Sequence, residues 1–396
     1  MVDEKGLALL SQRLSTGELA VFVDKVAPFS SKRLIVKKGN SLSEGSALAE
    51  GNRLANGMLS LAVDNNTGAI TSFFDKMSST ELVDMKAGYG IDQYVYVPGK
   101  NPDSAQFLSN VRISVKERGP LVASLLVVAD APGCDSFSYE IRITHNLNRV
   151  TLIDRLHKTA IRTKEGVHFA FPFNIPNGVI RYDVASGIVE PEKDQLAGSC
   201  KNFYSVVSWV DVSSESRGIT WTTTDAPLIE IGGITAEAPW MQTNAPSAIF
   251  FSYAMNNYWH TNYRADQSGP IEFRYSLFPH AAYDAVRATR LGREERQPLI
   301  VASAKRKLPT LPSLFHVTPN NIVVESVKPI EDGHSWLLHL YNPVAGSSDV
   351  RITWNGTGDV RLSLCNASGI PGDPVAAQFT LPAYGTQYVR VDRTDK

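Results

Sequence analysis

The chain has 396 residues, of which 43% are hydrophobic and 20% are charged, and its formal net charge is −1. This composition is ordinary for a globular protein with two or three domains, and the balanced charge gives no reason to expect nucleic acid or a membrane surface as a partner. No apolar run reaches the roughly 18 residues that a membrane span needs, and residues 1–14 lack the pattern of a signal peptide, so the localisation stays open.

Alternation of apolar and polar residues, which is typical of half-buried strands, recurs along most of the chain. Residues 59–63 and 70–74 alternate on either side of a turn at 64–68, and this arrangement predicts a β-hairpin. Further strands are predicted at 111–115, 121–128, 137–143, 150–159, on both sides of 213–218, and in the tail at 322–327, 336–341, 350–353, 360–364 and 386–391. Helical patterning is confined to residues 3–14 and 281–291. The sequence therefore predicts an all-β protein.

Three segments are expected along the chain. Residues 1–50 read as lead-in strands that end in a polar linker, and residues 51–304 contain strands without a break in composition. The strands of this middle segment suit two large stacked antiparallel sheets. A Pro-containing charged stretch at 305–312 separates them from short strands at 313–396, which we interpret as a compact β-sandwich.

Several segments, taken in order, resemble one enzyme family. They read GNRLANGMLSLAVDNNTGAITSFFDK from Gly51, then FPFNIPN, GIVEPEKDQLAGSCKNFY, WVDVSSESRGITWTTTDAPLIEIGGI and NNYWHTNY. The sequence of these segments is similar to that of the C-terminal β region of glycoside hydrolase family 38, the α-mannosidase family. The resemblance implies a galactose-mutarotase-like β-supersandwich followed by a β-sandwich.

The same resemblance implies partners that this chain does not itself contain. In that family a catalytic N-terminal α/β barrel carries an Asp nucleophile and a divalent metal, zinc, and no part of this sequence matches it. The expected partners are that barrel, a mannoside-like carbohydrate bound through the parent enzyme and, because family members are commonly oligomeric, a second copy of the chain. We expect the chain alone to be inactive, with no catalytic residue of its own.

Metal-ligand spacing is lacking in this chain. Cys134, Cys200 and Cys365 are odd in number and far apart, and no H-x-H or H-E-x-x-H pattern occurs. We expect no cofactor and no metal in this chain. Mutarotases of similar fold use histidines with a glutamate base, and His157, His168 and Glu190 could be assigned to those roles, but no motif supports that assignment.

A polar and aromatic run near the middle of the chain is the better site candidate. Its side chains combine amide and imidazole groups, which suit sugar hydroxyls, with flat rings, which suit sugar C–H faces. The candidates for sugar contact are Asn256, Asn257, Tyr258, Trp259, His260, Asn262 and Tyr263. The alternative is that this run packs between the sheet and the tail, with its asparagines in turns.

A second group of candidates is acidic. Glu190, Glu192 and Asp194 lie on a loop bounded by Pro and Gly residues, and we interpret them as solvated charges that lie near a sugar or order the loop. Catalysis of glycoside hydrolysis requires two carboxyl groups on opposite sides of one bond, and this spacing alone does not provide that arrangement.

Three functions remain open from the sequence. The chain could be the non-catalytic β region of an α-mannosidase-like hydrolase that supports the barrel and walls its sugar site. It could instead be a free-standing carbohydrate-binding or mutarotase-like protein. The third alternative is a β-rich assembly module without a sugar site.

Overall fold

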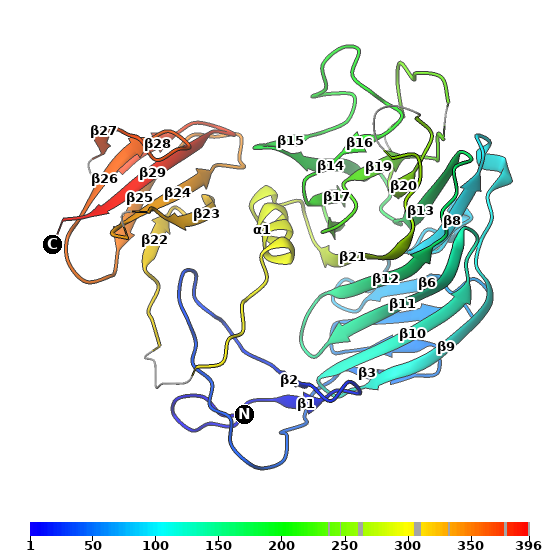
Figure 1. The fold of residues 1–396 in the computed structure, drawn as a ribbon, viewed down its shortest axis with the longest axis horizontal. Coiled ribbons are helices and arrows are strands. Elements are labelled where there is room, and N and C mark those ends of the chain that lie inside the picture. Colours follow the sequence, from blue (N-terminus) through cyan, green and yellow to red (C-terminus); the bar gives the residue numbers. More distant parts are fainter. Residues whose placement is uncertain are drawn as a thin grey trace.

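The computed structural model describes residues 1–236, 238–245, 247–259, 264–304, 310–331, 333–375 and 378–394. The protein is all-β, with two large stacked antiparallel layers followed by a smaller β-sandwich, as the sequence predicted (Figure 1). In this described part of the chain, no helix is long and apolar enough to cross a membrane.

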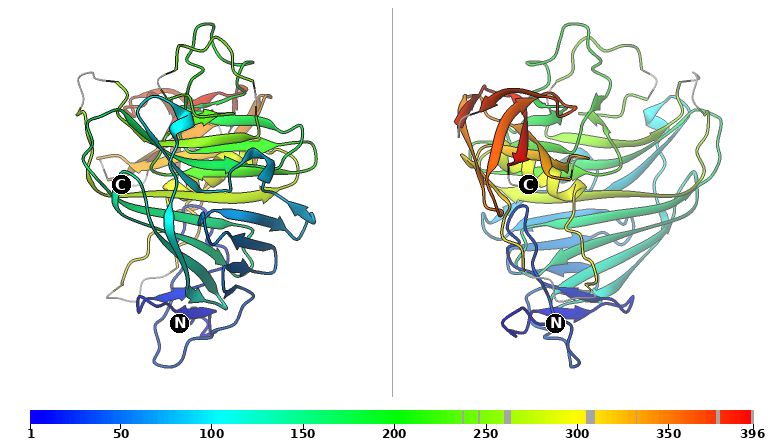
Figure 2. Two further views of the ribbon diagram at one scale, coloured as in Figure 1. Left: turned by 90° about the vertical axis from the view of Figure 1, so that its right-hand side faces the viewer. Right: turned by 60° about the vertical axis from the view of Figure 1, so that its left-hand side comes forward.

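The first layer is a nine-stranded sheet in the order β15-β14-β17-β18-β21-β12-β11-β10-β9, and its long strands are seen in Figure 2. Its strands are β9 (Ser109–Arg118), β10 (Val122–Asp130), β11 (Cys134–Thr144), β12 (Val150–Lys158), β14 (Val179–Val184), β15 (Gly187–Val189), β17 (Trp209–Ser213), β18 (Gly218–Thr223) and β21 (Gly269–His280). The strands that the sequence predicted between residues 111 and 223 all belong to this sheet.

The second layer consists of two five-stranded sheets, ordered β16-β19-β20-β13-β8 and β3-β4-β5-β6-β7. Isolated bridges between Ile70 and Ile91 and between Val83 and Phe173 join them. Their strands are β3 (Leu48–Glu50), β4 (Arg53–Ala55), β5 (Leu59–Val63), β6 (Ile70–Asp75), β7 (Thr80–Glu81), β8 (Gln93–Pro98), β13 (Glu165–Pro172), β16 (Tyr204–Ser205), β19 (Leu228–Ile231) and β20 (Ile249–Asn256), with short 3-10 helices at η1 (Met85–Ala87) and η2 (Pro102–Ser104).

The predicted hairpin at 59–74 is confirmed. Leu61 of β5 lies opposite Phe73 of β6, and both point into the core. The side chain of Asp64 accepts hydrogen bonds from the backbone N–H groups of Asn66 and Thr67, which closes the turn. Local sequence is therefore sufficient to determine this pairing.

Large aromatic rings fill the space between the two layers. Phe171 of β13 packs against Trp221 of β18, with ring centroids 5.3 Å apart, and against Phe250 of β20 at 5.5 Å. Trp221 in turn stacks on Tyr275 of β21 at 5.2 Å. Edge-to-face and offset-stacked rings of this kind add roughly 0.5–1.5 kcal/mol per pair to the burial of their apolar surface.

Two carboxyl groups are buried in this same interior. Asp92, just before β8, and Asp154, on β12, are 2% and 0% exposed, and neither carboxyl group has a hydrogen-bond partner in the described part of the chain. Desolvation raises the pKa of Asp92 from 3.8 to about 8. Desolvation, together with the charge of Asp92, also raises the pKa of Asp154 well above its ordinary value. The folded protein therefore favours the protonated form of this pair.

One helix, α1 (Ala285–Arg296), joins the supersandwich to the tail. Asp284 caps its first turn, and the helix approaches β17 so closely that a Cβ at Gly292 would lie 2.9 Å from the Trp209 ring. At its other end, Arg293 forms an ion pair with Glu325 of the tail. The sequence predicted this helix at 281–291, whereas it begins at Ala285 because Asp284 provides the cap.

The C-terminal sandwich packs a three-stranded sheet, β22-β25-β28, on a five-stranded one, β23-β24-β29-β26-β27, around its own apolar cluster. The strands are β22 (Phe315–Thr318), β23 (Val323–Pro329), β24 (Ser335–Tyr341), β25 (Ser348–Trp354), β26 (Val360–Cys365), β27 (Pro371–Val375), β28 (Gln378–Leu381) and β29 (Thr386–Arg393). In Figure 1 it lies across α1 from the supersandwich.

The expectation of a helix at residues 3–14 was wrong. Gly6 adopts φ 84°, which a helix does not permit, and the Asp3 side chain instead closes a turn by accepting from the N–H groups of Lys5 and Leu7. The chain then forms a short hairpin of β1 (Ser11–Arg13) and β2 (Leu19–Val21). This N-terminal segment also packs on the supersandwich, where the Gln12 side chain bonds backbone groups of residues 121 and 122.

The buried carboxyl pair gives a prediction about the pH dependence of stability. Because its folded-state pKa is raised above the unfolded value of 3.8, Asp92 contributes stability below about pH 4 that is lost as the pH rises through about 8. We expect Asp92→Asn to remove this loss, so that at about pH 9 the variant is more stable than the wild type by on the order of 1–3 kcal/mol. Urea unfolding at several pH values measures the difference.

The matched control for this substitution is Asp349→Asn, on an exposed position of β25. It should leave the pH dependence of unfolding unchanged. If Asp92→Asn also keeps the wild-type pH dependence, the carboxyl pair is not protonated in the folded protein and this explanation is wrong.

Candidate functional site

Three long loops gather at one end of the supersandwich, at the top of Figure 1, and we call them the loop cluster. They comprise residues 190–203, 232–247 and 257–268, of which residues 237, 246 and 260–263 lie outside the described part of the chain. The side chain of Asn202 ties two of the loops together by donating to the Pro239 carbonyl and accepting from the Met241 N–H. The loop cluster also exposes large apolar side chains, namely Leu196, Trp240 and Trp259.

The three predicted acidic residues lie in the first of these loops. Glu192 binds the Lys201 ammonium at 2.7 Å and accepts from the Asn244 N–H, and the hydrogen bond from Lys201 lowers the pKa of Glu192. Asp194 accepts from the backbone N–H of Glu190. The Glu190 carboxylate lies 3.4 Å from the ammonium of Lys193 and 3.6 Å from the Arg181 guanidinium. All three groups therefore bind the protein's own cations or backbone.

The aromatic candidates divide between the interior and the surface of the loop cluster. Tyr258 is 1% exposed and belongs to a small apolar cluster with Tyr253 and Ala236. Trp259 is 36% exposed, and its ring lies 5.4 Å from that of Phe203. The remaining candidates of this run, His260, Asn262 and Tyr263, lie outside the described residues.

The two asparagines of the run also differ. The Asn257 side chain accepts from the Glu165 N–H at 2.6 Å and donates to the carbonyls of Ile161 and Thr163. These bonds use the amide to hold the loop before β13 against the loop after β20. Asn256, by contrast, lines a pocket.

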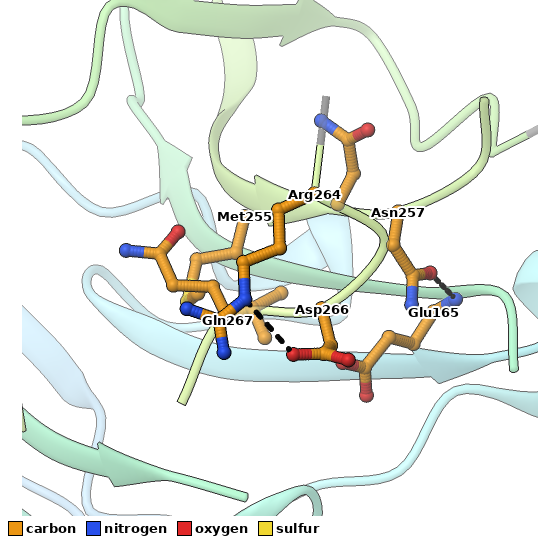
Figure 3. A pocket seen from close by; sticks show the side chains of 8 residues that line it. Glu165, Met255, Asn257, Arg264, Asp266 and Gln267 are labelled. Carbon is orange, nitrogen blue, oxygen red and sulfur yellow. Dashed lines mark hydrogen bonds and ion pairs between the residues drawn. The ribbon is translucent and has the colours of Figure 1, made fainter. Parts of the chain in front are cut away.

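That pocket, of about 280 Å³, opens where the two layers meet (Figure 3). It is lined by Glu165, Val167, Met255, Asn256, Asn257, Arg264, Asp266 and Gln267. At its floor, the Glu165 carboxylate lies 2.7 Å from the Lys158 ammonium of the opposite layer and accepts from the Tyr96 hydroxyl at 2.7 Å. The Lys158 side chain is 1% exposed, so this ion pair is buried.

Sequence reasoning missed the residues of this pocket floor. Lys158 falls in the inward-pointing register of β12, after Asp154 and Leu156, and an inward lysine requires a buried partner. That register was the available signal. The partner, Glu165, lies across the sandwich, and the sequence alone does not identify it.

A second missed residue, Glu230, forms a buried pair with His168. The His168 Nε2 lies 2.9 Å from a Glu230 carboxylate oxygen, and both side chains are 0% exposed. The other Glu230 oxygen accepts from the N–H and hydroxyl of Thr235, which fixes the start of the 232–247 loop. His157 lies instead on β12, half-exposed, 3.0 Å from Asp135. The two histidines therefore have separate structural partners.

The residues of the described ranges do not fit a metal site. In them, no three His, Cys, Asp or Glu side chains come together as ligands, and the cysteines are unpaired. The acidic loop residues and the buried His168–Glu230 pair are each occupied by protein partners. We therefore derive no metal-dependent step from this chain.

Comparison with known proteins identifies a family domain. Residues 54–226 match the model of the glycosyl hydrolases family 38 C-terminal domain. A search of curated protein sequences found no match.

Solved structures resemble almost the whole chain. An α-mannosidase from Enterococcus faecalis V583 matches with a TM-score of 0.74 and 14% identity, over 98% of this chain and 50% of that one. A family 38 glycosyl hydrolase protein from Enterococcus faecalis matches with a TM-score of 0.71 and 15% identity, over 98% and 52%. At such identities the likeness shows the fold alone, and the chain spans about half the length of these two proteins.

The family model and the fold agree with each other and with the resemblance seen in the sequence. Residues 54–226 therefore match the glycosyl hydrolases family 38 C-terminal domain, and almost the whole chain shares the fold of the matching half of two family 38 structures.

Proposed function

We propose that this chain is the non-catalytic β region of an α-mannosidase-like glycoside hydrolase. In this role it supports a catalytic domain outside this sequence, and residues of its loop cluster form part of the wall of that domain's sugar site. The observation that carries the proposal is the match of 98% of this chain to 50% of an α-mannosidase, together with the family domain at 54–226. The zinc of the family belongs, in this proposal, to the catalytic domain.

The loop cluster has the chemistry of a contact surface. Leu196, Trp240 and Trp259, one on each of the three loops, are 84%, 58% and 36% exposed, and apolar side chains that gather on one surface are typical of contact sites. Beneath them, the bonds of Asn202 and Glu230 hold the 190–203 and 232–247 loops together. A preorganised surface that combines aromatic rings and amides suits both a protein partner and the flat face of a sugar.

We also propose the division of the chain into a lead-in segment at 1–50, a supersandwich at 51–304 and a C-terminal sandwich at 313–396. The separate apolar clusters of the last two segments support it.

The proposal predicts that the chain alone does not hydrolyse α-mannosides. Hydrolysis requires one protonated and one ionised carboxyl group facing the same bond, whereas Glu192 and Asp194 are held by Lys201 and by backbone. The assay uses an aryl α-mannoside with and without added divalent metal, and a complete family 38 enzyme is the positive control. Turnover abolished by Glu190→Gln, Glu192→Gln or Asp194→Asn would contradict the proposal.

The second prediction concerns Trp259. Because its ring is partly exposed and rests on Phe203, we expect Trp259→Ala to change the free energy of unfolding by less than about 1.5 kcal/mol. In the assembled enzyme, the same change should lower α-mannoside hydrolysis about tenfold, which corresponds to roughly 1.4 kcal/mol. Thermal unfolding and steady-state kinetics measure the two effects.

Trp221→Ala is the matched control, because Trp221 is 0% exposed between the two layers. Its loss should cost about 3–5 kcal/mol of stability, as for other large core truncations. If Trp259→Ala destabilises the chain as strongly as Trp221→Ala, Trp259 is a packing residue, and the proposal that the loop cluster forms part of the sugar-site wall is wrong.

A further inference from the structure

The pocket at the meeting of the two layers is separate from the exposed aromatic side chains of the loop cluster. Its lining comes from the start of β13, the end of β20 and residues 264–267 (Figure 3). A volume of about 280 Å³ lies at the small end of the range for ligand pockets. The space is therefore suited to a ligand of about one sugar ring rather than to an oligosaccharide.

The charges around this pocket are already paired. Glu165 is neutralised by Lys158 at 2.7 Å, and Asp266 by Arg162 at 2.7 Å and Arg264 at 3.4 Å. Each carboxylate has a cation, and the one cation in excess is carried by the exposed pair Arg162 and Arg264, so the pocket has no buried unpaired charge that an ionic ligand would neutralise. This arrangement favours a neutral ligand.

Hydrogen-bonding capacity remains at the pocket wall. Among the described residues, no hydrogen bond uses the side-chain amide of Asn256 or Gln267, and the Arg264 guanidinium makes a single contact of 3.4 Å, to Asp266. These groups offer several N–H donors and two amide oxygens, which match the mixed donor and acceptor character of vicinal hydroxyls. Val167 and Met255 supply an apolar wall for the C–H face of a ring.

We propose that this pocket binds one neutral, hydroxyl-rich ring, a monosaccharide or a terminal sugar unit, through Asn256, Gln267 and Arg264. The Lys158–Glu165–Tyr96 group forms the rigid floor. Asn257 is a positioning residue, because its amide holds together the two loops that border the pocket. The ligand class rests on the proposed carbohydrate role, whereas the site itself rests on the pocket geometry.

The test is a titration of the purified chain with methyl α-mannoside, methyl α-glucoside and methyl β-galactoside. Binding is measured by isothermal titration calorimetry and by saturation-transfer NMR. We expect at least one to bind saturably with a Kd of about 1 mM. Asn256→Ala and Gln267→Ala should each weaken that binding about three- to tenfold without changing the melting temperature, since neither amide bonds to the described protein. Glucuronate, as the anionic probe, should bind no more tightly than the neutral glycosides.

The matched control is Gln378→Ala, an exposed glutamine on β28 of the C-terminal sandwich, which should bind like the wild type. The proposal is overturned if no neutral glycoside binds saturably, if both pocket variants retain wild-type affinity, or if glucuronate binds at least tenfold more tightly than every neutral glycoside.

Failure of the pocket and failure of the proposed function give different results. If the pocket binds sugar in the isolated chain but Trp259→Ala leaves the assembled enzyme's hydrolysis unchanged, only the proposed role of the exposed aromatic side chains fails. If Trp259→Ala lowers hydrolysis while the pocket binds no glycoside, only the pocket proposal fails.

Discussion

The packing of two large sheets against one aromatic interior is the constraint on which the rest of this structure depends. Neither layer can bury its inner face alone, so strands far apart in sequence must face each other. Phe171 and Phe250 of one layer interlock with Trp221 and Tyr275 of the other. This interior is apolar enough to shift the buried Asp92 and Asp154 towards their protonated forms.

Polar and charged side chains are buried beside the aromatic interior where the chain passes from one layer to the other. Between β12 and β13 the chain crosses from one layer to the other, and the crossing brings Lys158 against Glu165. A buried ion pair of this kind requires good geometry and further hydrogen bonds to offset its desolvation, and Tyr96 provides one. The result is a rigid floor beneath a polar pocket. The loops of the loop cluster are held at their termini by strands of both layers.

Much of the fold could be predicted because strand alternation is a local signal. The hairpin of β5 and β6 and the strands β9, β11 and β12 follow from period-two patterns and from turn residues such as Asp64, and β10 follows from a nearly continuous apolar run. The helix expected at 3–14 failed because Gly6 and Asp3 specify a turn that outweighs the apolar spacing. Residue propensities alone therefore did not predict whether this segment forms a helix or a turn.

The site was less accessible to sequence reasoning, because its chemistry depends on contacts across the sandwich. The run at 256–263 was identified as one unit, yet its described members separate: Tyr258 is buried, Trp259 is at the surface, Asn257 binds backbone and Asn256 lines the pocket. Only the fold shows that Glu165 and Glu230 have partners in Lys158 and His168. Such pairs require long-range register, which a single sequence does not contain.

The central claim is that this β region works together with a catalytic domain. The most direct test is to isolate the α-mannoside-hydrolysing species from the native cells with an antibody against this chain, and to determine its mass and its peptides. The account predicts a species larger than this chain that contains a family 38 catalytic domain, either covalently or as a tightly bound partner. A native species that consists of this chain alone, with no catalytic domain in any fraction that contains it, would contradict the account.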